Sequence, residues 1–198
     1  RPTDVAEGEV RARIISEAAR IFADNGYSGS SIQDIVDAAG TTKPMVYYYF
    51  KNKEGLYQEI FHSFHDAAIG AQEAVVACED LTTREKLVKL VDGHFESARR
   101  TPEKARFMFA AHFGPSKDMP AVRDHDQEHT LFAAMVNLAM TGVEKGDLRG
   151  EPVMIAQALL GQILIHLTFH ISHQNPILLA DNAAERVVDQ LLSGMNGT

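Results

Sequence analysis

The sequence predicts an all-α fold of about nine helices. Apolar residues recur at helical spacing along nearly the whole chain, and helix start and stop signals separate the periodic segments. Strand signals are missing, because no hairpin dipeptide lies between alternating apolar runs. At 198 residues and 45% apolar content, the chain can fill one compact core or two small ones.

The first three helices are predicted from local signals. The first is expected over about 7–24, where apolar residues share one face. The second begins at the capping box formed by Ser31 and Asp34 and ends at Gly40, a residue that tolerates a left-handed helix terminus. The third opens near Thr42.

The later helices are predicted from caps and prolines. A second capping box, Thr82 with Glu85, starts the fifth helix, and Pro102 suits the first turn of the sixth. The sixth is apolar almost all round, so we expect it to be buried on most sides. The expected ranges are about 52–77, from 82 onward, 102–113, 120–142, 152–173 and 180–192.

Composition narrows the class of protein. The single cysteine, Cys78, excludes an internal disulfide and suits a reducing cytoplasm. We find no leader-like segment and expect no apolar stretch of membrane-spanning length. The sequence therefore predicts a cytoplasmic protein that has no membrane partner.

Residues 31–50 predict a helix-turn-helix, since two short helices meet at a tight turn containing glycine. In such motifs the second helix enters the DNA major groove. The net charge of −8 does not contradict this, because residues 1–53 carry seven basic and seven acidic side chains and residues 54–198 carry twelve and twenty. We therefore expect a DNA-binding domain over 1–53 and a second domain over 54–198.

Candidate DNA contacts gather around the third helix. Thr41 and Thr42 suit phosphate contact, Lys43 suits a guanine edge, and Met45 suits a thymine methyl group. Lys51 and Lys53 are expected to contact phosphates of the DNA backbone. Tyr48 and Tyr49 are expected to face DNA, whereas Tyr47 is expected to pack partly inward, because three consecutive tyrosines cannot all face the core. The full set is Ser31, Thr41, Thr42, Lys43, Met45, Tyr47, Tyr48, Tyr49, Lys51 and Lys53.

The segment of about 9–61 resembles the DNA-binding domain of the TetR family of transcriptional regulators. The resemblance is carried, in order, by Phe22, Gly26, Tyr27, Ile35, Ala39, Gly40, Tyr47, Phe50, Lys51, Lys53, Glu54 and Leu56. Pro44 stands where many members have glycine, and the first turn of a helix tolerates it. The resemblance implies a repressor that binds a palindromic operator as a homodimer and is released by a small-molecule effector.

The same resemblance implies that 54–198 is a ligand-binding and dimerisation domain, with an effector pocket among the fourth to eighth helices. Aromatic, methionine, histidine and amide side chains there suit a small apolar or amphipathic ligand. They suit an ordinary core equally well. The candidate lining is Phe64, Phe107, Met108, His112, Phe113, Phe132, Met135, Gln162, His166 and Phe169.

The last two predicted helices carry more apolar surface than a chain of this size needs for its own core, which favours a two-fold helical interface. The resemblance implies the same dimer. The alternative is that this surface packs within one chain. The candidate residues are Leu159, Leu160, Ile163, Leu167, Ile171, Val187, Val188, Leu191 and Leu192.

A sensor and an enzyme are the alternative classes of function. The sequence has nine histidines, including pairs at 62/65, 125/129 and 166/170. They suggest the alternative of a metal- or ligand-binding sensor with weak or vestigial DNA binding. Without a cysteine set or an HExxH motif, we assign no metal site and no cofactor. The sequence contains neither a nucleophile elbow nor a glycine-rich phosphate loop, so we do not expect an enzyme.

Overall fold

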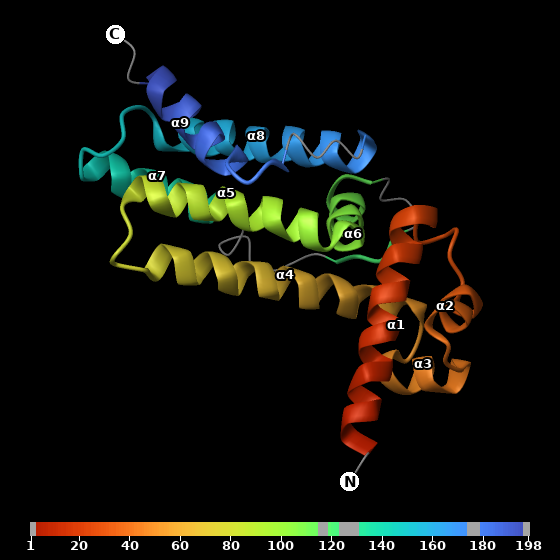
Figure 1. Ribbon diagram of the computed structural model, residues 1–198. Coiled ribbons are helices and arrows are strands. Elements are labelled where there is room, and N and C mark those ends of the chain that lie inside the picture. The colour runs from red at the N-terminus through yellow and green to blue at the C-terminus, as the bar shows by residue number, and fades with distance from the viewer. Residues whose placement is uncertain (1–2, 115–118, 123–130, 174–178, 196–198) are drawn as a thin grey trace. The chain divides into compact units, whose positions relative to one another are not determined.

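The computed structural model describes residues 3–114, 119–122, 131–173 and 179–195, and these form nine α-helices and no strand (Figure 1). The all-α prediction is confirmed. The helices are α1 (Thr3–Asn25), α2 (Ile32–Ala39), α3 (Lys43–Phe50), α4 (Lys53–Ala77), α5 (Thr83–Arg100), α6 (Pro102–Phe113), α7 (Leu131–Glu144), α8 (Pro152–His173) and α9 (Ala183–Met195).

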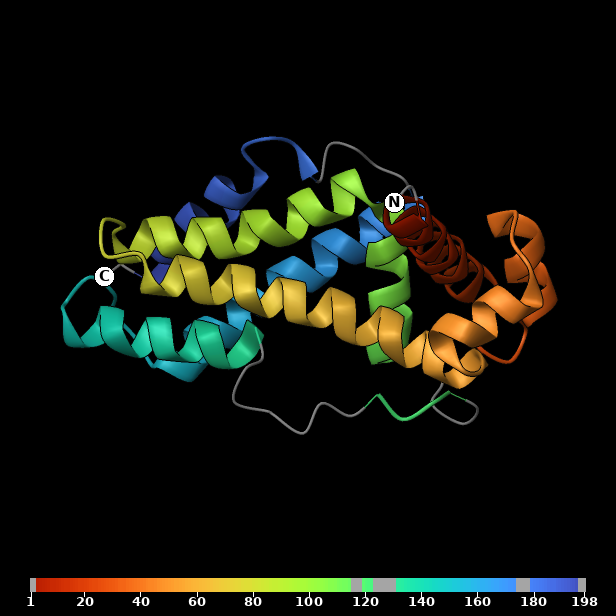
Figure 2. The same ribbon diagram turned by 90° about the horizontal axis from the view of Figure 1, so that it is seen from below.

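The chain divides into two compact units. The first comprises Arg1–Asp66 and Glu103–Arg123, and the second comprises Ala67–Pro102 and Asp124–Thr198. Helix α4 is continuous and gives residues to both units (Figure 2). Helix α6 belongs to the first unit although it follows α5 in sequence. The predicted functional boundary after residue 53 remains a prediction, since compactness alone does not assign a function to either unit.

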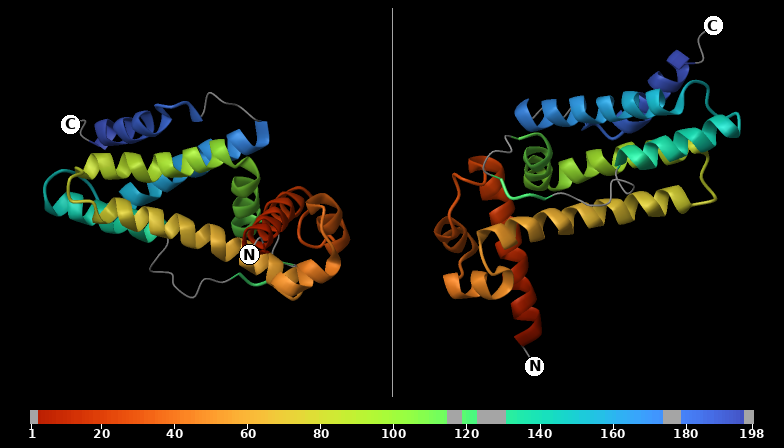
Figure 3. Two further views of the ribbon diagram at one scale, coloured as in Figure 1. Left: turned by 60° about the horizontal axis from the view of Figure 1, so that its bottom comes forward. Right: turned by 180° about the vertical axis from the view of Figure 1, so that it is seen from behind.

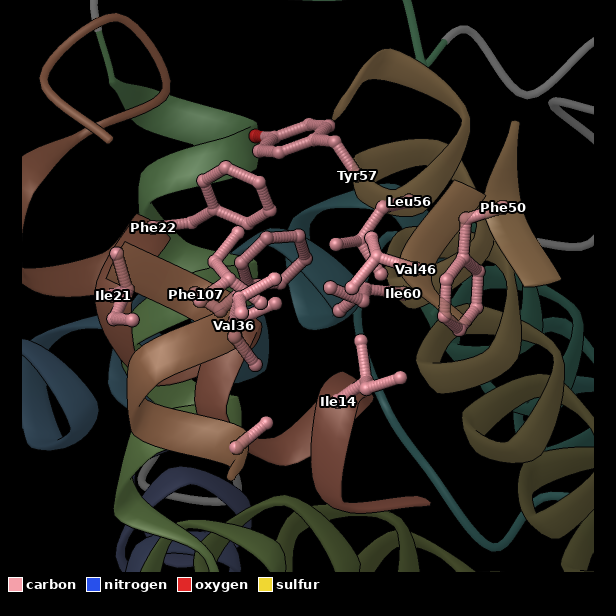
Figure 4. Close-up of a cluster of buried hydrophobic side chains, with 14 of the residues drawn as sticks. Ile14, Ile21, Phe22, Val36, Val46, Phe50, Leu56, Tyr57, Ile60 and Phe107 are labelled. Carbon is pink, nitrogen blue, oxygen red and sulfur yellow. The ribbon is translucent and has the colours of Figure 1, made fainter. Parts of the chain in front are cut away.

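The first unit has an apolar core built from α1, α2, α3, α4 and α6. Helix α1 packs on α2, and α2 packs on α3. Figure 4 shows Phe22, Val36, Val46, Leu56 and Phe107 pointing toward a common centre, one from each helix, and all five are buried. Burial of such side chains stabilises a fold by about 1.5–3 kcal/mol each. Helix α6 thus contributes to the same core that holds the helix-turn-helix.

The second unit is built from the long helices α5, α7, α8 and α9. Helix α8 packs against α5, α7 and α9, and α5 also packs against α7 and α9 (Figure 3). Arg84 on α5 and Asp189 on α9 form a two-bond ion pair with N–O distances of 2.7 and 2.8 Å. Arg99 donates to the carbonyl of Leu179 across 2.8 Å, which fixes the chain just before α9.

Most helix boundaries agree with the sequence-based ranges, and two expectations about helices are wrong. The helix predicted from Pro120 begins at Leu131 instead, since residues 119–122 are not helical and 123–130 lie outside the described residues. Helix α6 is not buried on most sides: only Phe107 is fully buried, and 58% of Phe113 is exposed. Its apolar composition therefore does not reflect a central position.

Helix α8 corrects the expectation that no apolar stretch reaches membrane-spanning length. By length and composition, Pro152–Ser172 could cross a membrane, with a mean hydropathy of 1.6. Core helices of globular units meet the same criterion, and α8 packs along three neighbours in the second unit. Only 22% of that window is buried within the structure, so α8 also presents an apolar face outward.

Candidate DNA-binding site

Helix α2 is held at both ends by its own sequence. Asp34 receives a hydrogen bond from the Ser31 amide at 2.9 Å, and the Ser31 hydroxyl oxygen accepts one from the Asp34 amide at 3.2 Å. At the other end Gly40 has φ 58° and ψ 45°, a left-handed conformation that glycine adopts at low cost. The predicted capping box and glycine terminus are confirmed, and the turn into α3 follows directly.

Helix α3 presents one apolar face and one polar face. Val46 and Phe50 are buried in the first unit, one turn apart. Tyr48 lies on the opposite side with 73% of its surface exposed, which confirms that at least one tyrosine faces solvent. The fixed φ of Pro44 in the first turn favours this helix start.

The orientation expected for two of the tyrosines is wrong. Tyr49 packs partly against the core, 5.8 Å from the ring centroid of Phe50, whereas 47% of Tyr47 is exposed. Both residues lie about 80° from the middle of the face shared by Val46 and Phe50, because successive helical residues turn by about 100°. Periodicity therefore could not decide between them.

The remaining DNA-contact candidates differ in how far their side chains are exposed and free to contact DNA. Thr42, Lys43 and Lys51 are exposed, and Thr41 and Met45 are partly exposed. The Ser31 side chain is already hydrogen-bonded to Asp34, with its hydroxyl 2.8 Å from that carboxylate. Ser31 therefore acts first as a helix cap.

The joint between α3 and α4 is one tight turn. Lys51 has φ 66° and ψ −48°, and the Asn52 amide donates to the carbonyl of Phe50 across 2.7 Å. This is a γ-turn with a positive φ at its central residue, a rare and strained form. Asn52 then caps α4, because its side-chain oxygen accepts from the Gly55 amide at 2.6 Å. Asparagine is a common N-cap residue, so the sequence does contain a local signal for this cap.

Lys53 reaches back from the start of α4 to the loop between α1 and α2. Its ammonium donates to the carbonyls of Tyr27 and Ser30, with N–O distances of 2.8 and 2.9 Å. It also lies 4.2 Å from the centroid of the Tyr27 ring. This side chain was predicted as a phosphate contact, and most of its bonding capacity is used inside the protein.

The loop rests on an aromatic cluster. The Tyr27 ring stacks on Phe22 at 5.8 Å between centroids and meets Tyr57 edge-on at 5.3 Å. Burial raises the pKa of Tyr57, and burial followed by the nearby Glu54 carboxylate raises the pKa of Tyr27. Both phenols therefore stay neutral at physiological pH.

Five of the predicted pocket residues lie in the first unit. Phe107 is fully buried in its core, and Phe64 and Met108 pack against that core. His112 is exposed, with Nδ1 2.8 Å from the carbonyl oxygen of Met108. Phe113 is largely exposed. Of this set, Phe107 fits the alternative of an ordinary core residue.

Lys104, which the sequence did not single out, lies beside Phe64. Its ammonium is 4.8 Å from the centroid of the Phe64 ring, and burial lowers the pKa of Lys104. The spacing of apolar residues on α6 gives no indication that a lysine on this helix is half-buried.

The other five predicted pocket residues lie in the second unit. Met135 is fully buried there, Phe132 is partly buried, and the His166 ring stacks on Phe95 at 5.3 Å. Gln162 is exposed, and 44% of Phe169 is exposed. Gln162 and Phe169, the exposed members of this set, therefore do not line the interior of the second unit.

The predicted dimer residues separate into two groups. Leu159, Ile163, Val187 and Val188 are buried within the second unit, so for these four the alternative of packing within one chain is correct. The reason is that α8 and α9 pack against each other and against α5. The others are only partly buried: Leu160, Leu167, Ile171, Leu191 and Leu192.

The histidines do not assemble a metal site in the described part of the chain, where no group of three or more potential metal ligands is found. His166 places Nδ1 2.7 Å from the carbonyl oxygen of Gln162. The predicted pair at 125 and 129 lies outside the described residues.

Comparison with known sequences identifies the same region. Residues 14–60 match the model for bacterial regulatory proteins of the tetR family. The chain is 33% identical over 98 residues to the transcriptional repressor KstR2 of Rhodococcus jostii, covering 48% of each protein. It is 29% identical over 157 residues to the regulator TtgR of Pseudomonas putida, covering 76% of this chain and 74% of TtgR. The matches to the first curated relatives span about half of their length or less.

Solved structures agree over nearly the whole chain. The regulator PfmR of Thermus thermophilus has a TM-score of 0.69 at 26% identity, covering 92% of this chain and 95% of PfmR. FadR of Bacillus subtilis, solved with stearoyl-CoA, has a TM-score of 0.73 at 23% identity, covering 92% and 98%. With the helix-turn-helix and its capped helices in place, residues 14–60 belong to the tetR family of bacterial regulatory proteins.

Proposed function

We propose that this protein regulates transcription by binding DNA through α3. The observation that carries the proposal is the two-sided character of α3, which buries Val46 and Phe50 and presents Lys43 and Tyr48 outward. Side chains of this kind can reach base edges and phosphates in a major groove. The proposed further contacts are Thr41, Thr42, Met45, Tyr47 and Lys51.

The proposed DNA-binding form is a homodimer on a palindromic operator. Helix α8 leaves Met154, Ile165 and Phe169 exposed by 60%, 47% and 44%, and such an apolar face favours contact with a second copy. Two copies related by a two-fold axis would offer one recognition helix to each half-site. This role requires a cytoplasmic protein.

The proposed regulation is release of DNA by a small apolar or amphipathic effector. Helix α4 begins at Lys53 beside the helix-turn-helix and continues into the second unit, so it is the proposed lever. Coupling of this kind amounts to about 1–3 kcal/mol in typical allosteric proteins. Repression is the proposed outcome, because the similar proteins KstR2 of Rhodococcus jostii and ComR of Escherichia coli are transcriptional repressors, although FasR of Mycolicibacterium smegmatis is a transcriptional activator.

The first test is selection of random double-stranded DNA by the purified protein, followed by sequencing of the enriched pool. We expect a palindrome with two half-sites on one face of the duplex. The double variant Lys43→Ala, Tyr48→Ala should lose binding to that palindrome. The control Lys145→Ala removes an exposed cation from the second unit and should bind as the unaltered protein does.

Enrichment of no sequence at low salt, where attraction to phosphate is strongest, would contradict the proposal and favour a sensor with vestigial DNA binding. Effector release is tested next, by titrating ligands into the protein–operator complex. Stearoyl-CoA is a suitable first probe, because FadR of Bacillus subtilis was solved with it. An operator affinity that no bound ligand alters would contradict release by an effector.

A further inference from the structure

Lys53 occupies a site made of three acceptors. Two are the carbonyl oxygens of Tyr27 and Ser30, at 2.8 and 2.9 Å, and the third is the face of the Tyr27 ring at 4.2 Å. Hydrogen bonds from a charged donor are stronger than neutral ones, and a cation gains further from an aromatic face. The ammonium is therefore a strong link between the first turn of α4 and the loop that precedes α2.

That loop determines where α2 begins. Ser30 is buried and its hydroxyl donates to the carbonyl of Gly26 across 2.7 Å. The next residue, Ser31, is the N-cap of α2. A carbonyl held at residue 30 therefore fixes the chain one residue before the cap. Since α2 packs on α3, the position of the loop also affects the recognition helix.

Lys51 provides a close comparison. It lies two residues before Lys53, it is exposed, and its side chain makes no hydrogen bond or ion pair among the described residues. Both lysines were predicted to contact phosphates. Only Lys53 has its ammonium directed to backbone carbonyls of its own chain.

We propose that Lys53 supports DNA binding as a positioning residue, by holding the loop of residues 26–30 against the start of α4, and not through a phosphate contact. The proposal rests on the proposed DNA-binding function. It also gives α4 a direct connection to α2, so a displacement of the first turn of α4 moves the loop with it.

The test compares Lys53→Met with Lys51→Met on the operator obtained from the selection, across 50–200 mM salt. Loss of a phosphate contact in both copies of a dimer reduces the slope of log K against log salt by about 1.8. We expect Lys51→Met to show this reduction with an unchanged melting temperature. We expect Lys53→Met to bind about ten-fold more weakly at every salt concentration, with an unchanged slope and a lower melting temperature.

Lys53→Arg keeps the test decisive if Lys53→Met does not fold. A phosphate contact predicts near-normal affinity for Lys53→Arg, because the charge is retained. A positioning role predicts weaker binding at an unchanged slope, because a planar guanidinium does not match a site shaped for an ammonium. Faster amide hydrogen exchange at residues 26–31 in either variant would agree with the positioning role.

Two failures can be told apart. If the unaltered protein enriches no DNA, the proposed function fails and this inference fails with it. If the unaltered protein binds but Lys53→Met reduces the salt slope as Lys51→Met does, at an unchanged melting temperature, only the positioning role is overturned.

Discussion

At the residue scale, two exposed glycines illustrate how backbone conformation decides the effect of a side chain. Gly40 ends α2 at φ 58°, whereas Gly70 lies within α4. A Cβ added at either position meets no atom within 4 Å, so space does not distinguish them. Only the left-handed conformation of Gly40 penalises an L side chain.

We therefore predict opposite effects of one substitution at these two sites. Gly40→Ala should lower the free energy of unfolding by about 1 kcal/mol, from the cost of a left-handed alanine. Gly70→Ala should raise it by about 0.5–1 kcal/mol, because alanine favours a helix interior over glycine. Urea denaturation of both variants measures this, and a stabilised Gly40→Ala would contradict the conformation described for the turn.

At the element scale, α5 depends on a charged cap as well as on its buried face. Thr82 and Glu85 form a reciprocal capping box, with the Thr82 amide donating to the Glu85 carboxylate across 2.8 Å. Hydrogen bonds from the Thr82 amide and hydroxyl lower the pKa of Glu85 below its usual value of 4.5. A lowered carboxyl pKa stabilises the folded state above the unfolded pKa, and the contribution is lost as pH falls through the folded value.

This gives a prediction about acid stability. Glu85→Gln retains a hydrogen-bonding side chain at the cap and removes its charge. The variant should melt below the unaltered protein at pH 7, and the difference should shrink as the pH falls below about 4.5. Thermal melts at several pH values measure this, and a difference independent of pH would show that the charge contributes nothing.

The helices were predictable because their signals are local. Caps such as Ser31 with Asp34 and Thr82 with Glu85 satisfy backbone groups within one turn, so the sequence contains the complete interaction. The contacts of Lys53 join residues 23 and 26 positions apart, and no local pattern specifies them. The choice between Tyr47 and Tyr49 depended likewise on neighbours distant in sequence.

At the scale of the whole molecule, the DNA-reading part is completed by a segment far along the chain. Phe107 of α6 lies in the core of the first unit, with ring centroids 5.0 Å from Tyr57 and 6.4 Å from Phe22. The family resemblance made Phe107 a candidate pocket residue with an ordinary core as the alternative, because a sequence does not show which core a buried aromatic joins.

A pair of substitutions on α6 tests this assignment. Phe107→Ala should lower the free energy of unfolding by about 3–5 kcal/mol, from lost burial and the cavity left behind. Phe113→Ala removes an exposed ring from the same helix and should change it by less than about 0.5 kcal/mol. Chemical denaturation compares the two, and an equally mild Phe107→Ala would contradict a core position.

The membership of α6 in the first unit has a practical consequence for building hybrid regulators. A graft that transplants only the N-terminal helices onto a foreign effector domain would leave Phe22 and Tyr57 without the Phe107 ring that covers them. Such a chimera should expose apolar surface and aggregate unless the recipient supplies an aromatic side chain at the corresponding place. Crossover points in this protein are therefore better chosen to carry residues 103–123 together with residues 1–66.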